Sequence, residues 1–268
     1  MCVTCGCSNG AKVTTHEHVH ADGIHHTHIH DHGHDHGHAL SIPARDTETL
    51  RLEMQILGKN QLVAERNRGW LAGRHVLALN LLSSPGAGKT TLLERTLTDL
   101  NSQIRISVVE GDQATSNDAE RIRATGARAV QINTGTGCHL EADMLQRALE
   151  LLKPEFGSLL LIENVGNLVC PALFDLGERG KVVILSVTEG DDKPLKYPHM
   201  FAAANVLVLC KIDLLPHVRF DPDRAIQNAL TVNPRLTVFR LSAYTGDGMT
   251  QWYDWLKHEL ANDREAAS

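Results

Sequence analysis

The sequence predicts an α/β domain built on a mostly parallel sheet with helices on both faces, preceded by a tail of different composition. Two observations predict this class. Short apolar runs bounded by turn residues alternate with helix-length segments along most of the chain, which is typical of parallel strands joined by right-handed crossovers. The first run, residues 76–82, leads through a glycine-rich turn into a helical apolar pattern. A chain of 268 residues is long enough for such a domain.

The expected elements follow in order. Buried strands are predicted at residues 76–82, 104–109, 129–132, 159–162, 182–187, 206–209 and 236–240. The helix after Lys89 has an apolar stripe at three- and four-residue spacing, formed by Leu92, Leu93, Thr96, Leu97 and Leu100. Two more helices are predicted over residues 117–125 and 141–152. A first helix over about residues 46–68 would place Leu50, Met54, Leu57 and Ala64 on one face.

Composition excludes several classes of protein. A formal net charge of −6 with no basic stripe argues against nucleic-acid binding. The sequence has no run of 18 apolar residues and no signal-peptide core at its start, so we expect neither membrane insertion nor secretion. The six cysteines are then best interpreted as reduced thiols of a cytoplasmic protein.

Residues 1–40 form a separate segment rich in cysteine, glycine and histidine, and residues 45–268 form the predicted domain. Eleven of the 16 histidines lie in this tail, which has few apolar side chains and is expected to be disordered without metal. Cys2, Cys5 and Cys7 place three thiols within six residues. A planar sulfur and nitrogen set would favour nickel, whereas zinc prefers a tetrahedral version of similar ligands. The alternative is a redox pair or thiols without a ligand.

The turn Ser83–Thr90 has the pattern of a phosphate-binding loop. Its glycines let backbone N–H groups turn towards an anion at the start of the following helix. Lys89 would reach the outer phosphates, and the Thr90 hydroxyl would bind magnesium. Serine stands at position 83, where the usual pattern begins with glycine. The residues predicted to bind the nucleotide here are Pro85, Gly86, Ala87, Gly88, Lys89, Thr90 and Thr91.

A second pattern predicts that the nucleotide is a guanine nucleotide. Lys211 and Asp213 follow a predicted strand. A carboxylate accepts the N1–H and the exocyclic amino group of guanine, whereas adenine offers an acceptor at N1. Cys210 stands where the usual Asn-Lys-x-Asp motif has asparagine, so one supporting hydrogen bond is in question. After a later strand, Ser242 and Ala243 would present backbone N–H groups to the guanine carbonyl.

Acidic residues at two strand ends complete the predicted magnesium site. Asp112 and Glu163 join Thr90 as its candidate ligands, because magnesium prefers hard oxygen donors. Gly166 follows Glu163 at the spacing of a γ-phosphate sensor. We expect Lys89, Asp112 and Glu163 to carry catalysis. No arginine finger or water-positioning glutamine can be assigned, which predicts slow intrinsic turnover that a partner could accelerate.

Three further residues in the predicted domain could hold a soft metal. Cys138 and His139 follow the third predicted strand, and Cys170 lies seven residues beyond Glu163. Singly, each cysteine is more often a small buried apolar residue than a ligand. Together these residues offer two sulfurs and an imidazole on loops beside the nucleotide site, so a metal there could report the state of the nucleotide.

These motifs resemble the hydrogenase nickel-incorporation GTPases, the HypB family, over nearly the whole chain. The resemblance is carried by residues 83–91, 110–112, 135–139, 162–171 and 196–198, together with the Cys2, Cys5 and Cys7 cluster and the histidine tract. It implies a P-loop NTPase fold of the SIMIBI-type GTPases. It also implies GTP hydrolysis coupled to nickel delivery into the [NiFe]-hydrogenase large subunit precursor, with zinc as another possible occupant. The partners implied are a HypA-like accessory protein, a SlyD-like isomerase and a second copy in a GTP-linked homodimer near Cys138, His139 and Cys170.

Three other functions stay open at this point. A urease-type nickel GTPase shares the domain plan, although the amino-terminal cysteines disfavour it. A nickel storage protein with a regulatory GTPase domain fits the long histidine tract. An ATP-dependent kinase would show a preference for adenine nucleotides.

Overall fold

The structure, a computed structural model, describes residues 16–19, 25–28, 47–112, 117–135 and 137–265. Cys2, Cys5 and Cys7 lie outside the described residues, so their predicted metal site stays a prediction. The chain divides into two compact units, Met1–Met54 and Gln55–Ser268. The predicted boundary at residues 40–45 likewise stays a prediction.

The first unit contains two short strands. β1 (His16–Val19) pairs antiparallel with β2 (His25–His28), so that His18 lies opposite His26. The disorder expected for residues 1–40 without metal stays a prediction.

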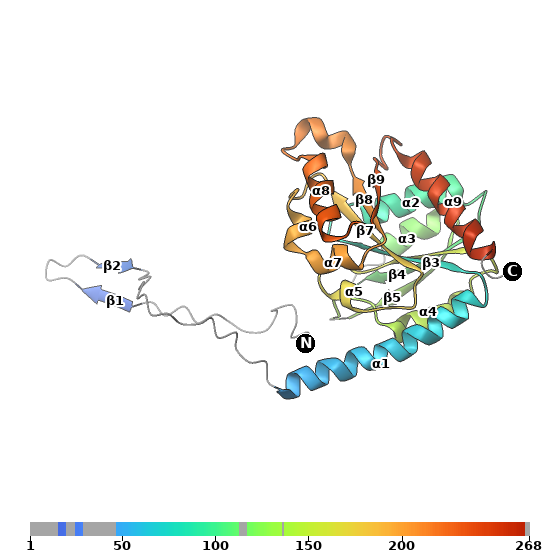
Figure 1. The fold of residues 1–268 in the computed structure, drawn as a ribbon, viewed down its shortest axis with the longest axis horizontal. Coiled ribbons are helices and arrows are strands. Elements are labelled where there is room, and N and C mark those ends of the chain that lie inside the picture. The colour runs from blue at the N-terminus through green and yellow to red at the C-terminus, as the bar shows by residue number, and fades with distance from the viewer. Residues whose placement is uncertain (1–15, 20–24, 29–46, 113–116, 136, 266–268) are drawn as a thin grey trace. The chain divides into compact units, whose positions relative to one another are not determined.

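The second unit is built on the predicted parallel sheet (Figure 1). Its strands are β3 (Leu77–Ser83), β4 (Ile106–Asp112), β5 (Arg128–Asn133), β6 (Leu159–Glu163), β7 (Gly180–Ser186), β8 (Val206–Cys210) and β9 (Thr237–Arg240). All neighbours are parallel, in the order β5-β4-β6-β3-β7-β8-β9. β4 departs most from its predicted range, because pairing with β5 continues to Asp112 opposite Asn133. The carboxyl ends of β3, β4 and β6 therefore meet at one edge of the sheet.

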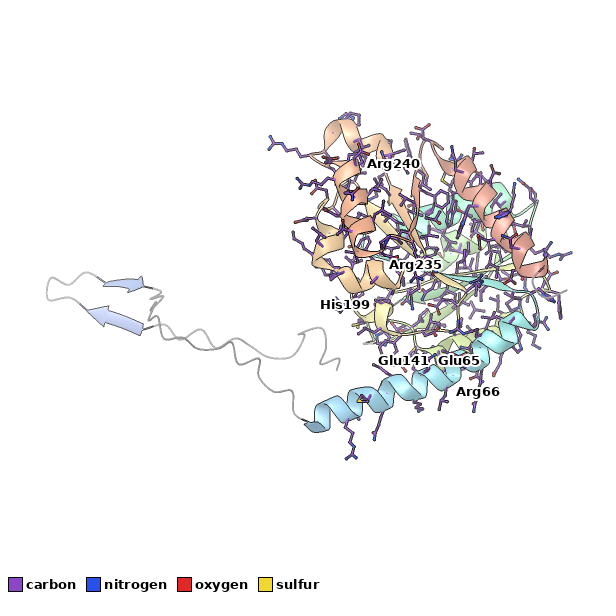
Figure 2. The ribbon with its side chains drawn as sticks, in the orientation of Figure 1. Glu65, Arg66, Glu141, His199, Arg235 and Arg240 are labelled. Carbon is purple, nitrogen blue, oxygen red and sulfur yellow. The ribbon has the colours of Figure 1, made fainter. Side chains whose placement is uncertain are left out.

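Helices cover both faces of this sheet, as predicted. They are α2 (Lys89–Leu100), α3 (Asn117–Ala124), α4 (Ala142–Leu152), α5 (Cys170–Leu173), α6 (Lys193–Lys196), α7 (Pro198–Ala203), η2 (Ile212–His217), α8 (Pro222–Val232) and α9 (Met249–Glu265). One core joins α2 and α9 to alternate residues of the central strands, and two others join α4, α7 and α8 to the opposite face. The side chains in Figure 2 fill the space between these layers. Within the described ranges, no helix combines the length and hydropathy needed to cross a membrane.

The long helix α1 (Thr47–Ala72) corrects the apolar face predicted for this segment. Met54 is 74% exposed and Leu57 is 38% exposed. Among the residues of the predicted face whose side chains are described, only Ala64 is buried. The buried positions include Asn60 and Asn67 instead. The spacing of apolar residues predicted the wrong face of the helix, because polar side chains that form hydrogen bonds can be buried as well.

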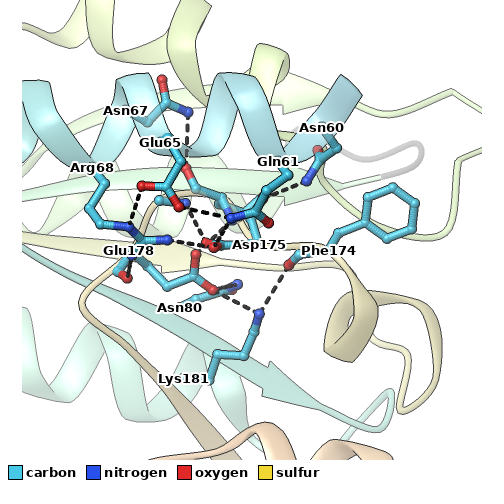
Figure 3. A network of polar contacts seen from close by, with 12 residues as sticks. Asn60, Gln61, Glu65, Asn67, Arg68, Asn80, Phe174, Asp175, Glu178 and Lys181 are labelled. Atoms are coloured by element: carbon cyan, nitrogen blue, oxygen red, sulfur yellow. Dashed lines mark hydrogen bonds and ion pairs between the residues drawn. The ribbon is translucent and has the colours of Figure 1, made fainter. Parts of the chain in front are cut away.

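These two asparagines attach α1 to the loops beside the sheet (Figure 3). Asn67 donates to the backbone oxygens of Ala142, at 2.8 Å, and Leu176, at 2.9 Å. Asn60 donates to the Asp175 backbone oxygen at 2.7 Å and accepts from the Ala142 N–H at 2.8 Å. The start of α4 and the segment before β7 are thereby fixed to one helix.

An ion-pair cluster continues these contacts into the sheet (Figure 3). Arg68 pairs with Asp175 at 2.5 Å and donates to the Glu178 backbone oxygen at 2.9 Å. The buried Glu178 carboxylate pairs with Lys181 at 3.0 Å and accepts from Asn80 of β3 at 3.1 Å. Because the buried charge has both a counter-ion and hydrogen bonds, removing one partner would be far more costly than at the surface.

Candidate functional site

The predicted phosphate loop lies at the carboxyl end of β3. Ser83 ends the strand and α2 begins at Lys89, with Gly88 as its N-cap. Gly86 and Gly88 have φ of 72° and 105°, values that side chains disfavour. The loop therefore presents the N-terminus of α2 and its backbone N–H groups to an anion.

Glu163 connects this loop to the end of β6. Its Oε1 atom accepts from the Lys89 ammonium at 3.1 Å and from the Thr90 hydroxyl at 2.7 Å. The residue is only 3% exposed, and in the described part of the chain its Oε2 atom is buried without a hydrogen-bond partner. A buried carboxylate oxygen with unused acceptor capacity beside a threonine hydroxyl suits a hard cation or its water.

A cavity of about 280 Å³ lies over this arrangement. It is lined by Pro85, Gly86, Lys89, Thr90, Glu110, Gly111, Glu163, Asn164, Val165 and Gly166. A Cβ atom on Gly166 would lie 3.1 Å from the Pro85 nitrogen, so the predicted γ-phosphate sensor packs directly on the phosphate loop.

The acidic residues that line this cavity are not all those that the sequence predicted. Asp112 is the last residue of β4, and its side chain lies outside the described residues, so its catalytic and magnesium roles stay predictions. Glu110 lines the cavity, is 2% exposed and lies opposite Glu163 in the sheet. Sequence reasoning missed Glu110 because it took Asp112 as the acidic residue at the end of this strand.

A second cavity, of about 320 Å³, brings the predicted base-binding residues together. It is lined by Gly88, Thr91, Leu92, Cys210, Lys211, Asp213, Leu214, Ser242, Ala243 and Tyr244. Lys211 adopts a left-handed conformation, with φ of 58°, and donates from Nζ to the Gly86 oxygen at 2.8 Å. The Lys-x-Asp segment therefore lies against the phosphate loop, as a nucleotide spanning both cavities requires.

The Ser242 N–H, whose predicted contact with the guanine carbonyl stays a prediction, is engaged within its own turn. It donates to the Asp247 oxygen at 2.8 Å, and the Ser242 hydroxyl accepts from the N–H groups of Tyr244 and Thr245. The turn is closed by its own contacts because its buried polar groups need partners. The role of the Ala243 N–H stays a prediction.

Arg95 of α2 fixes this turn from the side. Its guanidinium donates to the Ala243 oxygen at 3.3 Å and to Asp99 at 2.7 Å, and Tyr253 also donates to Asp99 at 2.6 Å. Burial alone would raise the pKa of Asp99, but hydrogen bonds from Arg95 and Tyr253 hold that pKa below its ordinary value. A charged Asp99 thus orients the arginine that contacts Ala243.

Cys138, His139 and Cys170 lie together, as the sequence predicted. One ligand atom from each falls within 4.8 Å of the others. Burial lowers the pKa of His139, which favours the neutral imidazole that metals bind. Its Nε2 atom is buried and, in the part of the chain that is described, has no hydrogen-bond partner. The donor set of two sulfurs and one imidazole suits nickel or zinc.

Asn164 joins this metal cluster to the nucleotide site, a contact that sequence reasoning missed. Its Oδ1 atom accepts from the Leu140 N–H at 3.1 Å, and its Nδ2 atom donates to Asn80 at 3.3 Å. A Cβ atom on Gly111 would lie 2.7 Å from Leu140 Cγ, so the Leu140 side chain packs directly against the backbone of β4. The only sequence signal for this contact is that Asn164 directly follows Glu163.

The loop after β7 supports the phosphate loop from its other side and was also missed. The Ser84 hydroxyl donates to Glu189 at 2.6 Å, and the Lys193 ammonium lies 3.3 Å from both the Ser84 hydroxyl and the Glu189 carboxylate. No spacing in the sequence links positions 84 and 189, because the contact depends on β7 being the neighbour of β3.

Comparison with known proteins shows the family to which the chain is similar. A profile of the CobW/HypB/UreG nucleotide-binding domain matches residues 77–240. The chain is 59% identical to the hydrogenase maturation factor HypB of Rhizobium leguminosarum bv. viciae over 221 residues, covering 82% of this chain and 74% of that protein. It is 56% identical to the corresponding factor of Escherichia coli (strain K12), covering 78% of this chain and 72% of that protein.

Two solved structures are similar to this chain in both fold and sequence. The hydrogenase maturation factor HypB of Archaeoglobus fulgidus has a TM-score of 0.71 at 39% identity and covers 76% of this chain and 99% of its own. HypB from Helicobacter pylori in complex with nickel has a TM-score of 0.71 at 38% identity and covers 78% of this chain and 97% of its own. The chain belongs to the HypB family of hydrogenase maturation factors.

Proposed function

We propose that this protein hydrolyses GTP to control the binding and release of nickel during maturation of [NiFe]-hydrogenase. The observation that carries the proposal is the placement of Cys138, His139 and Cys170 within 4.8 Å of one another, beside the nucleotide cavities. The relatives' names, which describe hydrogenase maturation, and the nickel complex of the Helicobacter pylori protein support it.

Magnesium fits the residues at the phosphate cavity. Thr90 and Glu163 would hold the ion, and the buried Oε2 atom of Glu163 supports this assignment. The bound ion would neutralise charge on the phosphate oxygens. Lys89 would bind the outer phosphates, and the loop at Gly166 would sense the γ-phosphate through its packing on Pro85.

Hydrolysis would act on the nickel site through two connections. The segment from Glu163 to Cys170 joins the predicted γ-phosphate sensor at Gly166 to one metal ligand, Cys170. Asn164 accepts a hydrogen bond from the N–H of Leu140, the residue that directly follows the other two ligands, Cys138 and His139. A hundredfold change in nickel affinity between GTP and GDP requires a coupling free energy of only about 3 kcal/mol. Contacts to the γ-phosphate are sufficient to supply it.

The proposal includes the partners that delivery requires. They are a second copy in a GTP-linked homodimer, a HypA-like accessory protein, the hydrogenase large subunit precursor and a SlyD-like isomerase. We place this activity in the cytoplasm, where thiol ligands stay reduced.

Replacing Asp213 with asparagine tests the choice of nucleotide. The amide would place a donor against the guanine amino group, so GTP affinity should fall by about 100-fold or more. XTP affinity should rise, since xanthine carries a carbonyl at that position. Competition binding of GTP, XTP and ATP to the intact chain measures both changes. A wild-type preference for ATP would instead support the kinase alternative and contradict this proposal.

A nickel storage function is the second candidate, favoured by the histidine tract in residues 16–38. Cells carrying either a deletion of that tract or Lys89→Ala separate the two functions. We expect Lys89→Ala to abolish hydrogenase maturation, whereas a storage protein would tolerate it and fail in the deletion at scarce nickel. Urease activity in the same cells tests the urease-type alternative.

A further inference from the structure

Two consecutive residues at the end of β8 hold two consecutive carbonyl groups of the phosphate loop. Cys210, the last residue of β8, is 3% exposed, and its thiol donates to the Ala87 oxygen with Sγ and O 2.9 Å apart. Lys211 donates to the Gly86 oxygen at 2.8 Å. The strand that leads to the base-recognition turn is thereby attached to the loop that faces the phosphates.

The thiol can serve as this donor because it keeps its proton. Burial raises the pKa of Cys210 to about 12, so the group is a neutral S–H at physiological pH. The Lys211 side chain packs closely on Gly88, where a Cβ atom would lie 3.3 Å from Lys211 Cε. A thiol is a weaker donor than an amide, but here it is fully buried and aimed at a single acceptor.

We propose that Cys210 is a positioning residue for guanine-nucleotide binding, whose S–H holds the phosphate loop against the turn that carries Asp213. The inference deepens the proposed function and depends on a guanine nucleotide binding across the two cavities. Base contacts at Asp213 and phosphate contacts at Lys89 then strengthen each other, because the Cys210 hydrogen bond, together with that of Lys211, fixes the distance between their two loops. The thiol thus fills the position that asparagine holds in the usual motif.

Three variants of the full chain test this role. Cys210→Ala removes the donor and should weaken GDP binding by about 3- to 10-fold, the range expected for one net hydrogen bond. Cys210→Ser keeps a donor and should bind GDP within twofold of the wild type. Val208→Ala is the packing control, because Val208 precedes Cys210 by two residues, is buried in the same core and contributes no side-chain donor. Its GDP affinity should be unchanged although its melting temperature falls.

Titration with GDP, at a temperature where melting curves show every variant folded, decides the matter. Weakening in Cys210→Ala with recovery in Cys210→Ser supports the assignment. The inference is overturned if Cys210→Ala binds like the wild type, if Cys210→Ser is as weak as Cys210→Ala, or if Val208→Ala loses the same affinity. Failure of the proposed function would look different, since the wild-type chain itself would then show no preference for GDP over ADP.

Discussion

Replacing Glu163 with glutamine is expected to lower the rate constant of GTP hydrolysis by about 100- to 1,000-fold, the usual effect of removing one preorganised group from a phosphoryl or acyl transfer site. The amide keeps the size of the side chain but removes the negative charge that pairs with Lys89 and accepts from Thr90. Magnesium would also exchange a charged carboxylate ligand for a neutral amide oxygen, which binds it more weakly. Phosphate release at saturating GTP and varied magnesium measures the change.

The control for this variant is Glu94→Gln on the same helix as Lys89 and Thr90. Glu94 forms an ion pair with Arg121 away from the phosphate cavity, and such partly exposed pairs contribute about 0–1 kcal/mol to stability. Its hydrolysis rate should stay within about twofold of the wild type. If Glu163→Gln hydrolysed GTP as fast as Glu94→Gln, the assigned role of Glu163 would be wrong.

The double variant Cys138→Ala, Cys170→Ala is expected to remove the metal site of the folded domain. Two of the three clustered ligand atoms disappear, and His139 alone cannot hold nickel tightly. The loss of affinity should exceed the roughly 10- to 100-fold that follows when only an outer hydrogen-bond partner of a ligand is removed. Nickel titration of the full chain, with Cys2, Cys5 and Cys7 changed to serine in every sample, isolates this site from the amino-terminal cysteines.

Cys210→Ser is the matched control, because Cys210 is a buried cysteine of the same domain but is not a member of the cluster. It should retain the same nickel stoichiometry as its parent. Unchanged stoichiometry in the double variant would show that these cysteines are only small buried side chains.

The phosphate loop and the metal cluster could be predicted from the sequence because each depends on a local pattern placed by the parallel sheet. The five residues of the stripe predicted on α2, four leucines and Thr96, are buried as their spacing indicated. Cys138 and Cys170 are 32 positions apart in the sequence, yet the loops that carry them follow strands whose carboxyl ends share one edge of the sheet. Strand order therefore brings them together.

Contacts that depend on single polar side chains could not be predicted. Nothing in the spacing of α1 indicates that Asn60 and Asn67, rather than Met54 and Leu57, face the domain. The only sign in the sequence of the hydrogen bond from Cys210 to Ala87 is that cysteine stands where the Asn-Lys-x-Asp motif has asparagine. Such contacts depend on which backbone groups remain unpaired after the sheet and helices have formed.

The account depends most on a link between the nucleotide and the metal. Nickel affinity of the domain site, measured with GDP and with a non-hydrolysable GTP analogue in the chain that lacks the tail cysteines, tests that link directly. We expect the two affinities to differ by about 10- to 100-fold, within the usual range of coupling between two sites. Equal affinities in the two nucleotide states would contradict the account.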